Sequence, residues 1–313
     1  MNVNFNNITD AYYSNQIALN KIYGQNGLLL WEKETIPTPV GSFIVFSSTN
    51  SFTIGIFPYN GRHDFNGKIQ YSKDGINWYS FNGSQETSLM DSYGIYRLYF
   101  RGKNNTIIHD TWDIDSATGV SCHGDIRNLL DYTNVNNTTM DEFCFSGMFL
   151  GQDKLITAPE LPATTLAPYC YDNMFKDCYY LTTAPELPAT TLEEGCYTGM
   201  FWGCLRLTTA PELPATTLAY RCYHQMFVDC YNLTTAPELP ATTLVSHCYE
   251  EMFSSCVKLN YIKAMFTTTP GESYTKNWVS YVAETGTFIK NSAATWTTTG
   301  KHGVPSGWTI QRA

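Results

Sequence analysis

Apolar and polar residues alternate along the first half of this chain. The alternating apolar positions include Phe52, Ile54, Ile56, Tyr96, Leu98 and Phe100. A period of two is typical of β-strands that bury one face. Asp74-Gly75 lies between two such runs and favours a tight hairpin turn. We therefore predict that residues 35–118 form a β-sandwich, which would act as a spacer.

A different pattern recurs every 26 residues in the second half. Residues 181–192 (LTTAPELPATTL) recur unchanged at 207–218 and 233–244, and the copy at 155–166 differs only by Ile156. Each copy is followed by Cys-Tyr-x-x-Met-Phe-x-x-Cys-x-x-Leu. The cysteines at the start of these segments are Cys144, Cys170, Cys196, Cys222 and Cys248. A fixed period of this length indicates a solenoid, in which each unit buries its apolar face against its neighbours.

The cysteine-rich half of each repeat fits a helix. At about 100° per residue, Cys170, Met174, Cys178 and Leu181 share one face, and the variable positions face outward. The proline-rich half cannot be helical and is predicted to be a short extended segment. Stacked strands repeat at about 4.8 Å and stacked helices at 8–10 Å, so the stack should curve with its helices on the convex side.

The order of Met174-Phe175, Cys178, Leu181 and the prolines at 185 and 188 resembles the leucine-rich repeats of BspA-type (treponemal) surface proteins. The resemblance covers roughly residues 140–266. Taken together, the expected fold class is α+β: an N-terminal β-hairpin and β-sandwich, followed by a curved α/β leucine-rich-repeat solenoid. The solenoid would have about five 26-residue coils, with caps at both ends.

This interpretation divides the chain into four parts. They are a docking segment (1–34), the β-sandwich spacer (35–118), the leucine-rich-repeat solenoid with its leading cap (119–266) and a C-terminal cap (267–313).

Residues 20–23 (NKIY) and 28–33 (LLLWEK) flank a Gly-Gln-Asn-Gly turn and predict a small hairpin. This stretch resembles the N-terminal module of phage minor structural proteins. The resemblance implies a segment that docks on a virion or joins an oligomer. The docking residues would be Lys21, Tyr23, Leu30 and Trp31. The alternative is an ordinary first hairpin of the domain that follows.

The chain is acidic, with 28 Asp+Glu, 19 Lys+Arg and a formal net charge of −9. Since no basic cluster accompanies this balance, a nucleic-acid surface is not expected. Residues 1–20 have neither a basic start nor an apolar core, and the apolar run at 27–31 is too short to span a membrane. We therefore expect neither a signal peptide nor membrane insertion.

Nine of the ten cysteines belong to the repeat. Cys170 and Cys178 would lie about 12 Å apart on one helix, and equivalent cysteines would be separated by the helix spacing, both beyond ordinary disulfide reach. Free thiols that act as small buried apolar groups are therefore predicted. No Cys-x-x-Cys spacing occurs, so neither a metal site nor another cofactor is expected.

No catalytic constellation is apparent, because the six histidines are scattered and no nucleophile motif or phosphate loop accompanies them. One row of like charges is predicted at Glu160, Glu186, Glu212 and Glu238. Carboxylates stacked about 5 Å apart repel each other unless they are solvated, bonded to backbone N–H groups or shared with a cation such as calcium. These alternatives stay open.

The variable outward positions are the candidate binding residues, because exposed Trp, Tyr and Arg commonly anchor interfaces. On the convex face they are Lys176, Tyr179, Tyr180, Trp202, Arg206, Tyr231 and Asn232. The alternative is that the aromatic residues pack at the edge of the core against the next coil.

The favoured hypothesis is a non-enzymatic virion surface protein, either a capsid fibre or decoration or a tail-associated adhesin. It would bind other virion proteins through its N-terminal segment and a host surface protein or glycan through the repeats. Analogy with fibre proteins suggests a homo-oligomer. The alternative is a BspA-like adhesin on a bacterial cell surface, and a polysaccharide lyase is the third hypothesis.

Overall fold

A computed structural model describes residues 11–13, 17–19, 21–23, 29–32, 41–57, 68–108 and 110–313 of the chain. The chain divides into two compact units, Met1–Pro39 and Val40–Ala313. In the first unit, β1 (Ala11–Tyr13) pairs antiparallel with β2 (Ile17–Leu19). β3 (Lys21–Tyr23) pairs antiparallel with β4 (Leu29–Glu32).

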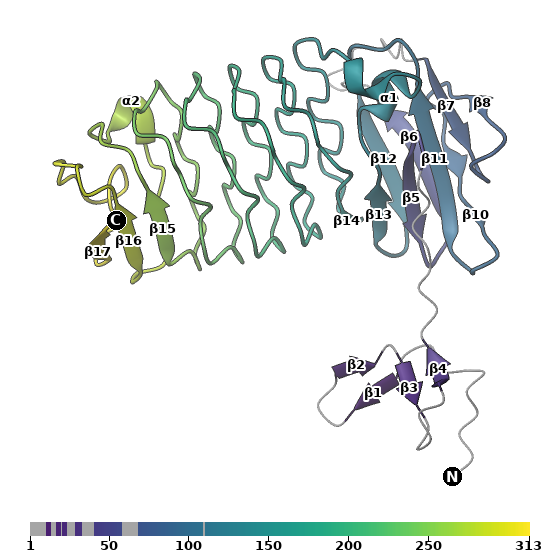
Figure 1. Ribbon diagram of the computed structural model, residues 1–313, viewed down its shortest axis with the longest axis horizontal. Coiled ribbons are helices and arrows are strands. Elements are labelled where there is room, and N and C mark those ends of the chain that lie inside the picture. Colours follow the sequence, from purple (N-terminus) through teal and green to yellow (C-terminus); the bar gives the residue numbers. More distant parts are fainter. Residues whose placement is uncertain are drawn as a thin grey trace. The chain divides into compact units, whose positions relative to one another are not determined.

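Two sheets face each other at the start of the second unit (Figure 1). The larger has the order β14-β13-β5-β11-β7-β8, with β10 beside β11. Its strands are β5 (Ile44–Ser48), β7 (Ile69–Ser72), β8 (Tyr79–Ser80), β10 (Leu89–Met90), β11 (Tyr96–Gly102), β13 (Val120–His123) and β14 (Leu155–Thr157). The smaller has the order β12-β6-β9, from β6 (Phe52–Phe57), β9 (Glu86–Thr87) and β12 (Thr111–Ser116). Phe46 and Phe100 of the larger sheet pack on Trp112 of the smaller, with the Phe100 and Trp112 ring centroids 4.8 Å apart.

The larger sheet continues into the repeats without a break. β13 pairs antiparallel with β5 and parallel with β14, and β14 belongs to the first repeat. The smaller sheet is tied to the same repeat, because the Trp112 backbone N–H donates to the Met148 carbonyl (2.8 Å) and the Ile114 backbone N–H donates to Gln152 Oε1 (2.8 Å). α1 (Asn128–Asp131) and the 3-10 turn η3 (Val135–Asn137) follow β13 in the chain, and the Tyr132 backbone N–H after α1 donates to the Gly102 carbonyl of β11 (2.9 Å). The sheets and the repeats therefore share one apolar core.

The prediction of an α+β fold with an α/β leucine-rich-repeat solenoid is wrong. In the described residues the helices are α1, η3 and α2 (Glu272–Thr275), and none lies in the 26-residue repeats. The segments predicted to be helical are chains of turns. Positive φ angles of 51–60° recur at every fourth residue, at Tyr169, Asn173 and Asp177. A left-handed residue in each turn cannot belong to an α-helix.

The backbone hydrogen bonds give the reason for this difference. Alternate N–H groups stay within the coil, as from Met174 to the Tyr171 carbonyl (3.3 Å). The N–H groups between these donate to carbonyls of the next coil, as from Phe175 to the Met200 carbonyl (2.9 Å). An α-helix would use all these donors internally and would hold its neighbour 8–10 Å away. The turns instead let both halves of each coil repeat at a strand-like spacing.

Identical side chains stack along the interior of these coils, in what we call the interior columns. The predicted inward set of Cys170, Met174, Cys178 and Leu181 is fully buried. Phe175 stacks on Phe201 with ring centroids 5.7 Å apart and planes 5° from parallel, and the adjacent tyrosine column stacks at 5.9–6.0 Å. The curved stack was predicted from a mismatch between the spacing of stacked helices and that of stacked strands. The segments predicted to be helical are turns that already repeat at a short spacing, so this mismatch and the predicted convex helical side do not exist.

A parallel three-stranded sheet follows the last repeat (Figure 1). It consists of β15 (Tyr261–Ala264), β16 (Thr287–Lys290) and β17 (Thr309–Arg312). Trp278 ends the aromatic columns, with its ring against Phe253 and its indole N–H on the Gly303 carbonyl (2.9 Å). Residues 277–281, which carry Trp278, consist of turns with positive φ at Asn277 and Tyr281.

Candidate binding surface

The outward residues singled out in the repeats, which we call the variable columns, form pairs between neighbouring coils. Lys176 and Trp202 occupy the same position in successive coils, and the lysine Nζ lies 3.7 Å from the indole centroid. The indole N–H then donates to Asp229 Oδ2 (3.2 Å) in the coil beyond. Both Lys176 and Trp202 are half-buried, so this pair covers the stack as well as facing solvent.

Tyr180 and Arg206 form a second pair of this kind. The guanidinium carbon lies 3.9 Å from the tyrosine ring centroid. Both side chains are exposed, and 41% of Tyr180 remains accessible. The guanidinium therefore covers one face of the Tyr180 ring, and the N–H donors of Arg206 stay accessible to solvent.

The remaining predicted binding residues take part in neither of these two pairs. Tyr179 and Tyr231 are exposed, and the nearby carboxylate of Asp229 raises the pKa of Tyr231. Asn232 is held by the stack, because its amide donates to the Leu205 carbonyl (2.6 Å) and accepts from Lys258 Nζ (2.7 Å). The variable columns thus combine edge packing with exposed aromatic surface.

The predicted docking residues lie in the first unit. Lys21 and Tyr23 fall in β3 and Leu30 and Trp31 fall in β4, so the two pairs belong to facing strands of one hairpin. Their side chains lie outside the described part of the structure.

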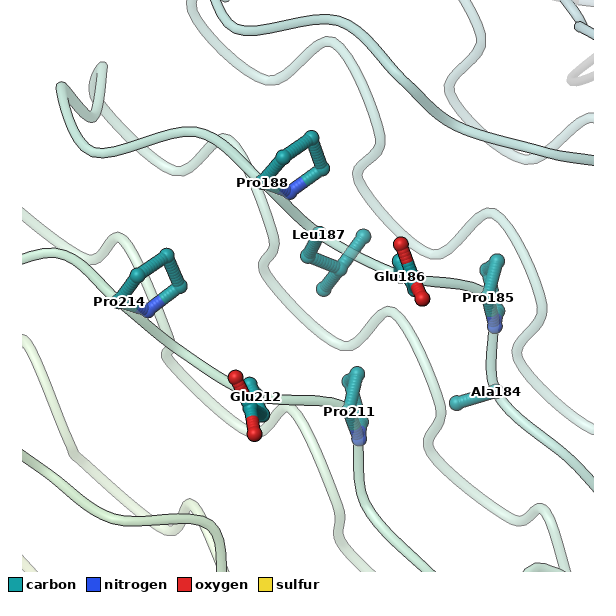
Figure 2. Close-up of a pocket in the computed structure, with 8 residues that line it drawn as sticks. All are labelled: Ala184, Pro185, Glu186, Leu187, Pro188, Pro211, Glu212 and Pro214. Atoms are coloured by element: carbon teal, nitrogen blue, oxygen red, sulfur yellow. The ribbon is translucent and has the colours of Figure 1, made fainter.

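A groove with acidic walls lies on the proline-rich side of the coils (Figure 2). Its lining residues are Ala184, Pro185, Glu186, Leu187, Pro188, Pro211, Glu212 and Pro214. Glu186 and Glu212 stand at equivalent places in neighbouring coils and are exposed. At the end of the same row, Glu238 is paired with Lys263 (2.9 Å). No group of acidic, histidine or cysteine ligands suited to a metal ion occurs among the described residues.

A second, shallow groove lies where the larger sheet meets the first coils, and we call it the junction groove. It is lined by Ser47, Ser48, Thr49, Ile95, Thr118, Gly119, Ser121, Ile156, Tyr180 and Arg206. Ser48 Oγ donates to the Gly119 carbonyl (2.9 Å) and lies 3.1 Å from Thr118 Oγ1, which fixes this wall. Of its lining, only Tyr180 and Arg206 were predicted as site residues. The others come from strands that sequence alone could not place beside the repeats.

The thiols offer no reactive site. All ten cysteines are free and buried, and burial raises the pKa of every one, that of Cys170 to about 12. One column of them bonds to the backbone, as where Cys204 Sγ donates to the Phe175 carbonyl (3.2 Å). A protonated thiol that is already used as a donor is a structural group and a poor nucleophile.

One charge cluster, centred on the buried Glu250, lies between the last coils. Glu250 Oε2 lies 2.6 Å from His247 Nδ1 and 3.7 Å from His224 Nε2, and Lys276 donates to Glu250 Oε1 (2.9 Å). Burial opposes ionisation of Glu250, but hydrogen bonds from Lys276 and His247 outweigh it, so its pKa is lowered. This arrangement joins three coils by charge as well as by apolar packing.

Comparison with protein families, curated proteins and solved structures found no match. Among the described residues, no helix has the length and apolar character needed to cross a membrane.

Proposed function

We propose that this protein is a non-enzymatic attachment protein on the surface of a virion. In this proposal the hairpin segment at residues 1–34 joins the particle, and the stacked coils present a binding face to a host surface protein or glycan. The N-terminal resemblance to phage minor structural proteins supports the first part. The arrangement of the variable columns supports the second.

The proposal rests on the contrast between the inward-facing and outward-facing residues of each coil. The interior columns repeat one set of buried side chains in the four coils that begin at Cys170, Cys196, Cys222 and Cys248. The outward positions vary and expose aromatic side chains at Tyr179, Tyr180 and Tyr231. Exposed tyrosine and arginine side chains are common anchors of protein interfaces.

Immunogold labelling of purified virus particles with antibody against residues 40–313 tests the location. We expect labelling of intact particles, and we expect deletion of residues 1–34 to abolish incorporation while residues 40–313 still fold. Incorporation of the truncated chain at the normal level would refute the docking role. Labelling of bacterial envelopes without labelling of particles would favour the alternative, a BspA-like cell-surface adhesin.

Attachment is tested separately with fluorescently labelled residues 40–313 and intact host cells. We expect saturable binding that is reduced in the double variant Tyr179→Ser with Tyr231→Ser, because both side chains are exposed and neither supports the core. Unchanged binding would place the contact elsewhere on the protein.

A further inference from the structure

The junction groove is assembled where neighbouring coils depart from the repeat. Ile156 stands where the next three copies have threonine. Tyr180 and Arg206 stand in a column whose other members are lysine or asparagine. These departures lie outside the interior columns, which hardly vary. They share a place on one groove.

Arg206 is the one charged residue among the described residues that line the groove. The described part of the chain gives its guanidinium no hydrogen bond and no ion pair. Its contact is the ring of Tyr180, at 3.9 Å. A guanidinium stacked on a ring has a fixed plane, and its N–H fork matches the two oxygens of a carboxylate. The groove is therefore set up for an anion.

The remaining lining suits a sugar ring. Tyr180 and Ile156 offer an apolar surface, and Ile156 is packed so closely on Gly119 that a Cβ there would lie 2.7 Å from it. Ser47 and Ser121 stand opposite each other on β5 and β13, so both hydroxyls lie on one face of the sheet. Apolar walls with a few placed polar groups are typical of small-ligand sites.

We propose that the junction groove binds an acidic glycan through a carboxylated pyranose. The carboxylate would pair with Arg206, the ring would pack on Tyr180 and Ile156, and the sugar hydroxyls would bond to Ser47 and Ser121. This proposal rests on the attachment function above and names the ligand class for it. The acidic groove of Figure 2, whose charged lining is glutamate, would repel the same ligand.

Isothermal titration calorimetry on the full chain tests the proposal with two acidic probes, tri-galacturonic acid and 3′-sialyllactose. Their neutral counterparts are the carboxylate methyl esters of the same two sugars. We expect at least one acid to bind about tenfold or more tightly than its neutral counterpart, and the one that binds shows whether a uronic or a sialic acid fits. We also expect added salt to weaken the binding of the acidic sugar but not the binding of its neutral counterpart.

Two substitutions locate the site. Arg206→Gln should weaken the acid about tenfold and leave the neutral sugar unchanged, since one charge-assisted pair is lost. Tyr180→Ala should weaken both, whereas Tyr180→Phe should retain binding. The matched control is Lys258→Gln, an exposed cation in the same column outside the groove, which should change nothing.

Equal affinities for acidic and neutral sugars would overturn the proposal, as would an undetectable affinity for both acids or equal losses in Arg206→Gln and Lys258→Gln. A protein that attaches to cells but fails these titrations would refute the groove assignment and leave the attachment function in place. If the protein binds the acidic sugar but is absent from particles, the groove assignment stands and the proposed virion location is refuted.

Discussion

The interior and variable columns are built from the same coils but follow opposite rules. In the interior, each side chain stacks on a copy of itself, as where Phe201 lies between Phe175 and Phe227. On the outside, unlike side chains pair, as in Lys176 on Trp202. Self-stacking requires every coil to keep the same residue, whereas pairing of unlike groups needs only a suitable neighbour. Substitutions should therefore be costly in the first set and cheap in the second.

The largest effect is expected for Phe201→Ala. Removing a fully buried ring from the middle of an aromatic column leaves a cavity that two neighbouring rings border, and such changes cost about 3–5 kcal/mol. Chemical denaturation monitored by circular dichroism would measure the free energy of unfolding. Phe201→Leu, which keeps more of the volume, is the control and should cost clearly less. A loss below about 1 kcal/mol for Phe201→Ala would contradict the packing role.

A smaller loss is expected for Gly199→Ala. Its φ of +57° is unfavourable for alanine, and the added Cβ would lie 2.4 Å from Asn173 Oδ1 in the coil before. A left-handed alanine costs about 1 kcal/mol, and displacement of the asparagine adds to that. Gly151→Ala separates the two contributions, because it has a φ of +73° but no atom within 4 Å of the new Cβ. Equal losses in the two variants would show that contact between coils does not matter here.

The charge cluster at Glu250 predicts a loss of stability in acid. A carboxylate whose folded pKa is lowered stabilises the protein above its unfolded pKa of about 4.3, and this contribution is lost as the pH falls through the folded pKa. Burial lowers the pKa of His224 against the opposing charge of Glu250, so protonating this ring below about pH 6.5 also favours unfolding. Both groups act in the same direction.

Thermal melts between about pH 7 and pH 3 should therefore show a falling melting temperature, and Glu250→Gln should flatten the part of that decline below about pH 4.3. Glu186→Gln is the matched control, because this exposed glutamate has no ion pair among the described residues. The same slope in Glu250→Gln and the original protein would show that the cluster is not responsible.

The sequence predicted which residues face inward but not the backbone that places them there. A stripe of Cys, Met and Leu fits a helix, and burial of that stripe is what the structure has. Four-residue turns give nearly the same periodicity as a helix of 3.6 residues per turn, so apolar spacing could not separate them. A second signal was present in two coils: Asn173 and Asp177 in one, and Gly199 and Gly203 in the next, are four positions apart, and these residue types tolerate positive φ.

The candidate surface was predictable only in part. Tyr180 and Arg206 could be singled out because they vary within an otherwise regular column. Ser47, Ser121 and Gly119 could not, because their place beside the repeats depends on a parallel pairing of β13 with β14. That pairing joins residues 35 positions apart across an irregular segment, and no local pattern encodes it.

The smallest effect is expected for the half-buried pair of Lys176 and Trp202. A cation 3.7 Å from an indole centroid at a partly exposed site contributes about 0.5–1 kcal/mol. Single substitutions would mix this with other losses, since Trp202 also donates to Asp229. A double-mutant cycle with Lys176→Met and Trp202→Leu removes those terms and isolates the coupling free energy. The control cycle pairs Lys176→Met with Tyr281→Ser, an exposed residue several coils away, and should give no coupling. If the first cycle also gives none, the outward pairs contribute nothing to stability, and their side chains are free to be selected for binding alone.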